Sequence, residues 1–216
     1  MFKLVLLGPP GAGKGTQADV LGSKYGIPHI STGNIFRDHI TRQTDLGKQV
    51  QHLLSRGDLV PDDVTNELVR DRLARNDCAA GFILDGYPRT TDQAKFLKRL
   101  ARITAVVEIA VPEETVVKRL SSRWMCACGR AYGLVSDTPR KRGQCDSCDA
   151  QLFQRNDDKP EVIRHRFQVY RESTQPLVEF YKGENRYLRV DGAGSIQDVT
   201  KRISDALVRH VAHVVG

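Results

Sequence analysis

The sequence has no apolar run near the ~18 residues that a membrane-spanning helix needs, and it has no internal repeat or low-complexity segment. Its first residues enter an apolar strand pattern directly, without the features of a secretory leader. Only five of 216 residues are cysteines, which argues against a disulfide-stabilised secreted scaffold. We therefore expect a soluble cytoplasmic protein without a membrane partner.

Acidic residues are in the minority, with 26 Asp and Glu against 33 Lys and Arg, for a net charge of +7. A surplus of this size suits nucleic acid, a membrane surface or a polyanionic small substrate, and charge alone does not choose among them. With 40% hydrophobic residues, the chain is long enough to form one α/β core with small inserted lobes.

A glycine-rich loop that contains a lysine, residues 8–16, follows the first apolar run at once. Strand, glycine loop and helix in this order are typical of a phosphate-binding loop, because backbone N–H groups can turn inward onto an anion where a Cβ would obstruct. The helix that begins near Lys14 adds the positive end of its dipole. Gly15 stands where a magnesium-binding hydroxyl is usual, and Thr16 follows one residue later. The alternative is an ordinary glycine-rich turn, but the preceding strand and Lys14 favour a nucleoside phosphate site.

Short apolar runs alternate with helical patterns along the whole chain. Strands that alternate with helices form right-handed crossovers, so we expect an α/β fold. Its centre would be a parallel five-stranded sheet of the P-loop NTPase-like type, flanked by helices. The expected strands are residues 2–7, 28–30, 82–85, 105–111 and 187–190. In such a sheet the ligand binds at the carboxyl ends of the strands, where the glycine loop also lies.

Two segments do not fit the sheet pattern. Residues 31–60 are polar and helical, and residues 122–158 contain four cysteines and many turn formers. We expect both to be mobile lobes inserted at the carboxyl ends of the strands, where lobes close over nucleotides. The core domain would then comprise residues 1–30, 61–121 and 159–216.

The third apolar run ends in Asp85, a position at which phosphate-loop proteins direct magnesium, usually through water. Further along, Arg119 and Arg123 lie four residues apart after Pro112, so one helix would place both on the same face. A polyphosphate between them would turn their mutual repulsion into attraction. The alternative is a solvated basic face.

The cysteine segment has the layout of a structural zinc site, with Cys126 and Cys128 followed by Cys145 and Cys148. The first pair is one residue closer than the usual C-x-x-C. Four thiolate ligands would leave no open position for water or substrate, so the role of the zinc would be structural. Disulfides are the alternative, which a cytoplasmic location disfavours.

Four motifs occur in order along the chain: residues 8–16, Ser31-Thr-Gly with Arg37, residues 85–90 with Gln93, and residues 154–158. Together they resemble those of adenylate kinase in its long-lid form, with a zinc-binding lid. The likeness covers essentially the whole chain. It implies the magnesium-dependent reversible reaction ATP + AMP ⇌ 2 ADP, by in-line transfer between two bound nucleotides, which maintains adenine nucleotide balance. It also implies a monomer whose partners are ATP, AMP and ADP.

The resemblance further implies roles for individual residues. Those that would bind ATP are Gly11, Ala12, Gly13, Lys14, Gly15, Thr16, Arg119, Arg123, Ala131, Tyr132 and Gly194. Those that would bind AMP are Thr32, Arg37, Asp58, Leu59, Val60, Gly86, Tyr87, Pro88, Arg89, Gln93, Arg155 and Arg166. The residues that would stabilise transfer are Lys14, Arg89, Arg119, Arg123, Arg155 and Arg166, with Asp85 as the magnesium-directing carboxylate.

Two further expectations follow from the resemblance. Gln93 would read the adenine edge of AMP, which favours AMP over UMP or CMP. Asn34 replaces the acidic residue more familiar after Ser-Thr-Gly, with little expected consequence. A phosphate acceptor is already ionised at neutral pH, so no catalytic base is needed. The six histidines are therefore expected at surface or capping positions.

Three other readings remain open. The first is another nucleoside monophosphate kinase, or one that uses GTP as donor, because the donor base is read largely by backbone. The second is a zinc-ribbon protein that binds nucleic acid, although only Trp124 and Tyr132 lie among the basic residues near the cysteines. The third is a regulatory nucleotide binder without catalysis.

Overall fold

The computed structural model describes residues 2–133 and 137–215, and for residues 213–215 the backbone alone. Its centre is a five-stranded sheet in the order β2-β3-β1-β4-β7, with every neighbouring pair parallel. The strands are β1 (Lys3–Leu7), β2 (His29–Ser31), β3 (Phe82–Asp85), β4 (Ala105–Ala110) and β7 (Tyr187–Asp191). The predicted α/β class and all five predicted strands are confirmed, with ends that differ by at most one residue.

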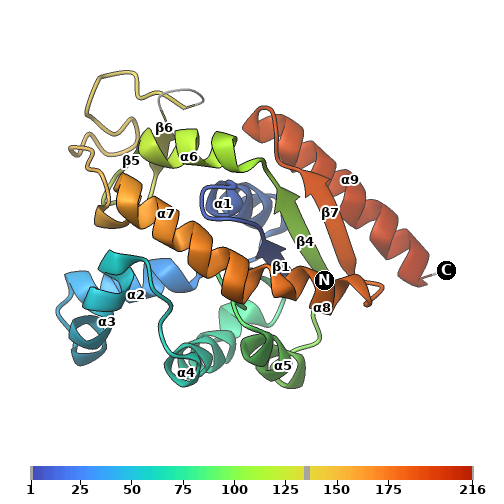
Figure 1. The fold of residues 1–216 in the computed structure, drawn as a ribbon. Coiled ribbons are helices and arrows are strands. Elements are labelled where there is room, and N and C mark those ends of the chain that lie inside the picture. The colour runs from blue at the N-terminus through green and yellow to red at the C-terminus, as the bar shows by residue number, and fades with distance from the viewer. Residues whose placement is uncertain (1, 134–136, 216) are drawn as a thin grey trace.

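Helices cover both faces of this sheet (Figure 1). They are α1 (Lys14–Tyr25), α2 (Thr32–Thr41), α3 (Asp45–Arg56), α4 (Asp62–Leu73), α5 (Thr91–Leu100), α6 (Glu113–Ser121), α7 (Pro160–Val169), α8 (Pro176–Lys182) and α9 (Ile196–Val215). A π-helical turn (Tyr170–Thr174) separates α7 from α8, and short 3-10 turns occur at Asn76–Cys78 and Asn156–Asp158.

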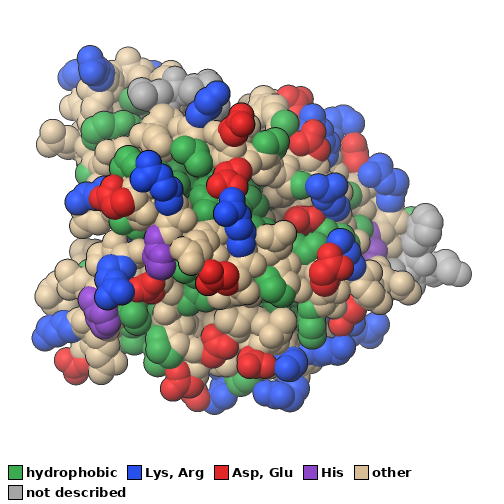
Figure 2. All heavy atoms as spheres, in the orientation of Figure 1, with side chains coloured by type: hydrophobic (Ala, Val, Ile, Leu, Met, Phe, Trp, Pro, Cys, Tyr) green, Lys and Arg blue, Asp and Glu red, His purple; other side chains and the backbone are tan. Residues whose placement is uncertain are grey.

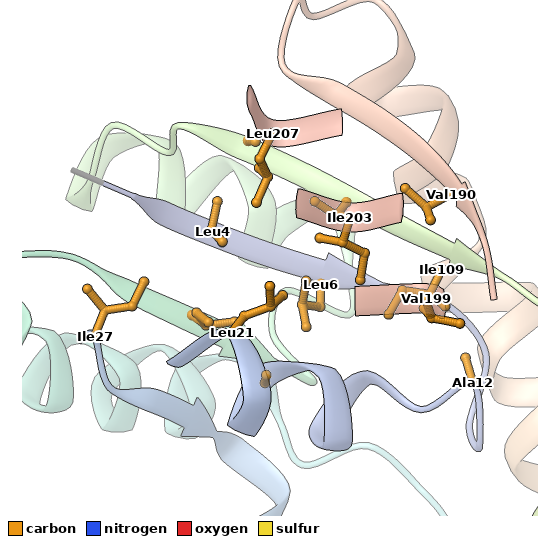
Figure 3. Packing of buried hydrophobic residues seen from close by; sticks show 14 residues of the cluster. Leu4, Leu6, Ala12, Leu21, Ile27, Ile109, Val190, Val199, Ile203 and Leu207 are labelled. Atoms are coloured by element: carbon orange, nitrogen blue, oxygen red, sulfur yellow. The ribbon is translucent and has the colours of Figure 1, made fainter. Parts of the chain in front are cut away.

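Alternate residues of β1 pack into two separate cores, as expected for a central parallel strand buried on both faces. Leu4 and Leu6 pack with α1 and α9, where Leu21 and Ile203 are completely buried (Figure 3). Val5 and Leu7 point to the opposite face, which α4, α5 and α8 cover. Both cores hold the first strand rigidly, and the glycine loop starts directly from its end.

The two segments that do not fit the sheet pattern lie on the left of Figure 1, with α7 running between them in this view and the C-terminus on the opposite side. One contains α2 and α3, which pack around Phe36, Val50 and Val60. The other contains an antiparallel hairpin of β5 (Arg123–Met125) and β6 (Ala131–Gly133). Each interrupts the order of strand and helix that builds the core.

The surface in Figure 2 has Lys and Arg interspersed with Asp and Glu over the whole visible face. The net positive charge is thus not gathered into one basic patch on this face. Within the described ranges, no helix has the length and apolar character to cross a membrane.

Candidate active site

A cleft of about 480 Å³ opens at the carboxyl ends of the central strands. Residues of both inserted segments line it, together with the glycine loop, the loop after β3, and α7. Every residue that the resemblance assigns to ATP or AMP lines this cleft, with one exception. Positions spread from Gly11 to Gly194 are therefore brought together in one place.

The exception is Tyr87, whose side chain is completely buried in the core below the cleft. Its hydroxyl donates to Asn66 Oδ1 at 2.6 Å, and burial raises the pKa of this phenol above its usual range. The left-handed φ of +75° at Gly86 turns the chain before it. Tyr87 supports the loop after β3 from beneath, and its side chain does not reach the cleft.

The glycine loop leads into α1 without a capping side chain. Gly13, at the N-cap, has a φ of +92°, which a residue with a Cβ rarely adopts. The first N–H groups of α1 are therefore available to an anion. Lys14 Nζ lies over the loop and donates to the carbonyls of Gly8 and Pro9 at 2.8 and 2.9 Å. Burial lowers the pKa of Lys14 to about 8, although the Asp85 charge opposes this.

Gly15 lies beside Asp85 in the structure. A Cβ at this position would make only an ordinary van der Waals contact with Asp85 Oδ2, at 3.4 Å, so sterics alone do not require glycine there. Burial would raise the pKa of Asp85, but His29 and Lys14 outweigh it and hold this pKa below its usual value. The carboxylate thus lies ionised beside the loop.

Three arginines in the cleft are held by two neighbouring aspartates. Arg123 forms a two-pronged ion pair with Asp158, with Nε to Oδ2 at 2.8 Å. Arg155 Nε donates to Asp157 Oδ1 at 2.8 Å, and Arg166 contacts both carboxylates, at 3.1 and 3.3 Å. Sequence analysis missed the aspartates as functional residues. The available signal was their place directly after Arg155, inside a motif already recognised.

The cluster remains short of negative charge despite these aspartates. Burial, reinforced by the charge of Arg155, lowers the pKa of Arg37 to about 9. Burial likewise lowers the pKa of Arg166 to about 10, and that of Arg89 below its ordinary value. Cations that repel one another in a desolvated cleft are stabilised by a bound anion. The geometry therefore favours a polyphosphate at this point.

Arg119 and Arg123 do not share one helix face, contrary to the sequence-based expectation. Helix α6 ends at Ser121, with Ser122 as its C-cap, and Arg123 begins β5 of the hairpin. Arg119 Nη2 donates to Gly192 O at 3.1 Å, whereas Arg123 turns to Asp158. The two arginines still line the same cleft, but from different elements.

The inserted segment of residues 31–60 forms one wall of the cleft through α2. Thr32 is buried and donates to Gly86 O at 2.9 Å, which joins the start of α2 to the loop after β3. Asn34 Oδ1 accepts from Arg37 Nη2 at 2.7 Å. The amide at position 34 therefore orients Arg37 without neutralising its charge.

His29 lines the cleft and is largely buried, which differs from the expected surface or capping position. Its Nδ1 lies 2.7 Å from Asp19 Oδ1, and its Nε2 lies 3.6 Å from Asp85 Oδ2. Burial alone would lower its pKa, but these two carboxylates outweigh burial and raise the pKa to about 9. The side chain of His213 lies outside the described part of the chain.

This arrangement predicts a pH-dependent stability. A histidine in the unfolded chain has a pKa of about 6.5, so the charged His29 contributes its full stabilisation of the fold below that pH. The contribution is lost as pH rises through about 9. We expect the free energy of unfolding of the wild type to fall by up to about 3 kcal/mol across this range, relative to His29→Gln.

Denaturant unfolding from pH 6 to pH 10 measures the difference in free energy of unfolding between the wild type and His29→Gln. His165→Gln is the matched control, because His165 also contacts an aspartate, Asp58, but its side chain is 42% exposed. Parallel pH profiles for the wild type and His29→Gln would contradict the prediction.

The four cysteines of the hairpin segment converge on one point. Their sulfur atoms all lie within 4.8 Å of one another, with Cys126 Sγ 3.3 Å from Cys148 Sγ and Cys128 Sγ 3.7 Å from Cys145 Sγ. Sulfurs bound tetrahedrally to zinc at about 2.3 Å lie about 3.8 Å apart. The sulfur positions and the donor type therefore fit a zinc ion, even with the shortened first pair.

Tyr132 connects this cluster with the cleft. Its side chain is 2% exposed, and its hydroxyl donates to Cys145 Sγ at 3.4 Å and accepts from the Asp146 N–H at 2.7 Å. The same residue lines the cleft beside Ala131, and the guanidinium of Arg130 lies 4.9 Å from its ring centre. Tyr132 thus contacts the cysteine cluster and also forms part of the wall of the cleft.

Comparison with known proteins agrees with this geometry. A family model described as adenylate kinase matches residues 6–186. The chain is 48% identical over 214 residues to the adenylate kinase of Thermosipho africanus (strain TCF52B), and the alignment covers 96% of this chain and all of that protein. It is 51% identical over 209 residues to that of Anaeromyxobacter sp. (strain Fw109-5), with 93% and 98% covered. For Thermotoga maritima it is 50% identical over 210 residues, with 94% and 96% covered. The chain therefore belongs to the adenylate kinase family, the ATP:AMP phosphotransferases.

Proposed function

We propose that the cleft holds ATP and AMP end to end, with their phosphates meeting at the arginine cluster. The observation that carries this proposal is the convergence of Lys14 and the six arginines assigned above, from both inserted segments and the core, on one cleft. Such a cleft provides an anion site at its centre and a wall at either end for a nucleoside. The γ-phosphoryl group then passes directly, in line, from ATP to AMP.

On the donor side, the free N–H groups at the start of α1 and the ammonium of Lys14 bind the β- and γ-phosphates. Arg119 reaches the same region from α6, and its hydrogen bond to Gly192 O keeps it in place. Ala131, Tyr132 and Gly194 line the end of the cleft that receives the adenosine of ATP.

On the acceptor side, Arg37 and Arg89 bind the AMP phosphate, and Gln93 reads the adenine. The segment 58–60 forms the floor of this end, held to α7 by the 2.6 Å contact between Asp58 and His165. Arg123, Arg155 and Arg166 lie between the two ends and stabilise the charge that spreads over the transferring group.

Asp85 and Thr16 are the residues that would hold magnesium, with Thr16 taking the place of the missing hydroxyl at position 15. Bound to ATP, the ion neutralises phosphate charge and so eases transfer between two anions. Asp85 is suited to hold the ion because its carboxylate lies ionised beside the loop, near His29 and Lys14.

Cys126, Cys128, Cys145 and Cys148 are proposed to bind a structural zinc ion. Backbone N–H groups of Cys128 and Ser147 donate to the sulfurs of Cys126 and Cys145, at 3.5 and 3.4 Å. Such hydrogen bonds stabilise thiolates, as metal ligation requires. The ion would fix the fold of a segment that has few buried residues of its own.

The inserted segments are proposed to act as covers, with residues 31–60 over AMP and residues 122–158 as the lid over ATP. Closure of both would exclude water, which would otherwise accept the phosphoryl group. The protein is proposed to act as a monomer.

The proposal predicts rapid formation of ADP when the protein is mixed with ATP, AMP and magnesium. It also predicts that two adenosines joined by five phosphates will bind tightly and compete with both substrates, because this molecule spans both ends of the cleft. A coupled assay across the four donor and four acceptor bases would test specificity. Hydrolysis of ATP without AMP-dependent ADP, or competition with one substrate only, would contradict the proposal.

A further inference from the structure

Asp62, to which no role is assigned above, contacts Thr90, the N-cap of α5, and Gln93 in the first turn of that helix. It is the first residue of α4, where the segment 31–60 rejoins the core. Its Oδ1 accepts from Gln93 Nε2 at 2.8 Å, and its Oδ2 accepts from the hydroxyl of Thr90 at 2.6 Å. The same Thr90 hydroxyl caps α5 by accepting from the Gln93 N–H at 3.1 Å.

The Gln93 side chain is therefore held at both ends. Its Oε1 accepts from the backbone N–H of Arg89 at 2.7 Å, while its Nε2 donates to Asp62. Gln93 is 2% exposed, yet it lines the cleft. Its position is thus fixed by Asp62 of α4 and by Arg89 of the loop that precedes α5.

The chemistry of these two neighbours also fixes which end of the amide is oxygen. A backbone N–H only donates, and an ionised carboxylate only accepts. If the amide were reversed, two donors would face each other at Arg89 and two acceptors would face each other at Asp62. Each mismatch leaves a buried polar group unsatisfied, which is costly. The observed orientation is the one that both partners allow.

An amide oxygen accepts two hydrogen bonds and an amide nitrogen donates two. Gln93 therefore keeps one acceptor position and one N–H for a ligand, in a fixed order. Adenine matches this order, because its amino group donates beside the acceptor N1. Hypoxanthine has almost the same shape but the opposite order, since its O6 accepts and its N1–H donates. A fixed amide accepts the first base and rejects the second.

We propose that Asp62 determines base specificity at the acceptor site, by locking the orientation of the Gln93 amide. Asp62 is a positioning residue that acts through Gln93 and need not contact the nucleotide. This inference rests on the proposed placement of AMP against Gln93.

The test compares the affinities of AMP and inosine monophosphate (IMP) by titration calorimetry, for the wild type, Asp62→Ala and Asp62→Asn. The wild type should bind AMP far more tightly than IMP. In Asp62→Ala we expect AMP to bind about 10-fold more weakly, with IMP unchanged or tighter, so that the ratio of affinities falls at least about 10-fold. Asp62→Asn, whose amide can present either group to Gln93, should show a change of the same kind but smaller. It carries the test if the alanine variant does not fold.

Asp63→Asn is the matched control. Asp63 is the next residue of α4, exposed, and it shares the favourable effect of a carboxylate in the first helical turn. It should leave both affinities and the melting temperature unchanged. The KM for ATP should stay constant in all variants.

Two results would overturn the inference in distinguishable ways. If the wild type discriminates but the Asp62 variants keep the wild-type ratio, or lose both nucleotides in parallel, Asp62 has only a structural role and the proposed function stands. If the wild type itself does not distinguish AMP from IMP, the placement of AMP against Gln93 is wrong as well.

Discussion

Replacing Arg89 by alanine is expected to lower kcat by about 10³-fold while the protein stays folded. Its Nε donates to Gly86 O at 2.8 Å, which fixes the plane of the guanidinium at the floor of the cleft. Among the described residues no carboxylate forms an ion pair with Arg89. Its charge is therefore available to the substrate, and burial makes it effective because little water screens it.

The effect should appear mainly in kcat, because charge on the transferring group is greatest in the transition state. A coupled assay measures turnover, and calorimetry checks the fold. Arg99→Ala is the matched control, since this exposed arginine of α5 lies outside the cleft. If Arg89→Ala keeps a turnover near that of the wild type, Arg89 does not stabilise the transferring phosphoryl group, and the proposed position of transfer is wrong.

The comparison with Arg123→Ala separates two kinds of arginine. Turnover should fall here as well, but so should stability, because Asp158 is buried and would keep only the 3.3 Å contact to Arg166. A buried carboxylate that loses its main partner is strongly destabilising. Replacing Arg89 leaves no buried carboxylate without its ion-pair partner among the described residues, so Arg89 is the cleaner probe of catalysis.

The sheet could be predicted from the sequence because its strands are buried on both faces. Each therefore appears as an unbroken apolar run, and alternation with helices leaves little choice of fold class. The phosphate loop was equally plain, since glycines and a lysine at fixed spacing have few other uses. These features are local, and local patterns are what a sequence displays.

The errors and omissions concern features that depend on where elements end and how they pair. No glycine or proline marks the end of α6 near Ser121, so no local pattern indicates that Arg123 belongs to a strand. His29 reaches Asp85 only because β2 lies beside β3 in a register that sets Ser31 opposite Asp85. Asp62 and Gln93 are 31 residues apart, and only the packing of α4 against the start of α5 joins them. Strand register and helix docking are long-range properties, which one sequence does not contain.

Removal of zinc should have the second large effect, a loss of stability centred on the hairpin segment. The buried cluster of this segment comprises Cys126, Tyr132, Cys145 and Leu152, and two of these four are proposed ligands. So small a core cannot stabilise the segment alone. Metal binding contributes about 10 kcal/mol or more to the folding of small zinc sites. If only about 3 kcal/mol of this is coupled to the whole protein, the melting temperature should fall by about 6–12 °C on chelation.

The measurements are metal analysis of protein purified under reducing conditions, calorimetry with and without chelator, and limited proteolysis. Cleavage should appear within residues 126–148 while the core remains intact. Cys145→Ser should reproduce the effect of chelation. Cys78→Ser is the matched control, because Cys78 is buried in the core beside Arg72, away from the cluster. Protein that contains no zinc, or that melts at the same temperature after chelation, would contradict the prediction.

The effect of zinc removal should also be unequal between the two substrates. Tyr132 donates to Cys145 and lines the cleft, whereas α2 and α3 form a separate core around Phe36. Loss of the metal would release Cys145 and with it the hydrogen bond that holds the tyrosine. The KM for ATP should therefore rise several-fold, while the affinity for AMP changes little. Equal changes for both nucleotides would mean that the cysteine cluster affects the cleft only through general loss of stability, and that Tyr132 is not the connection.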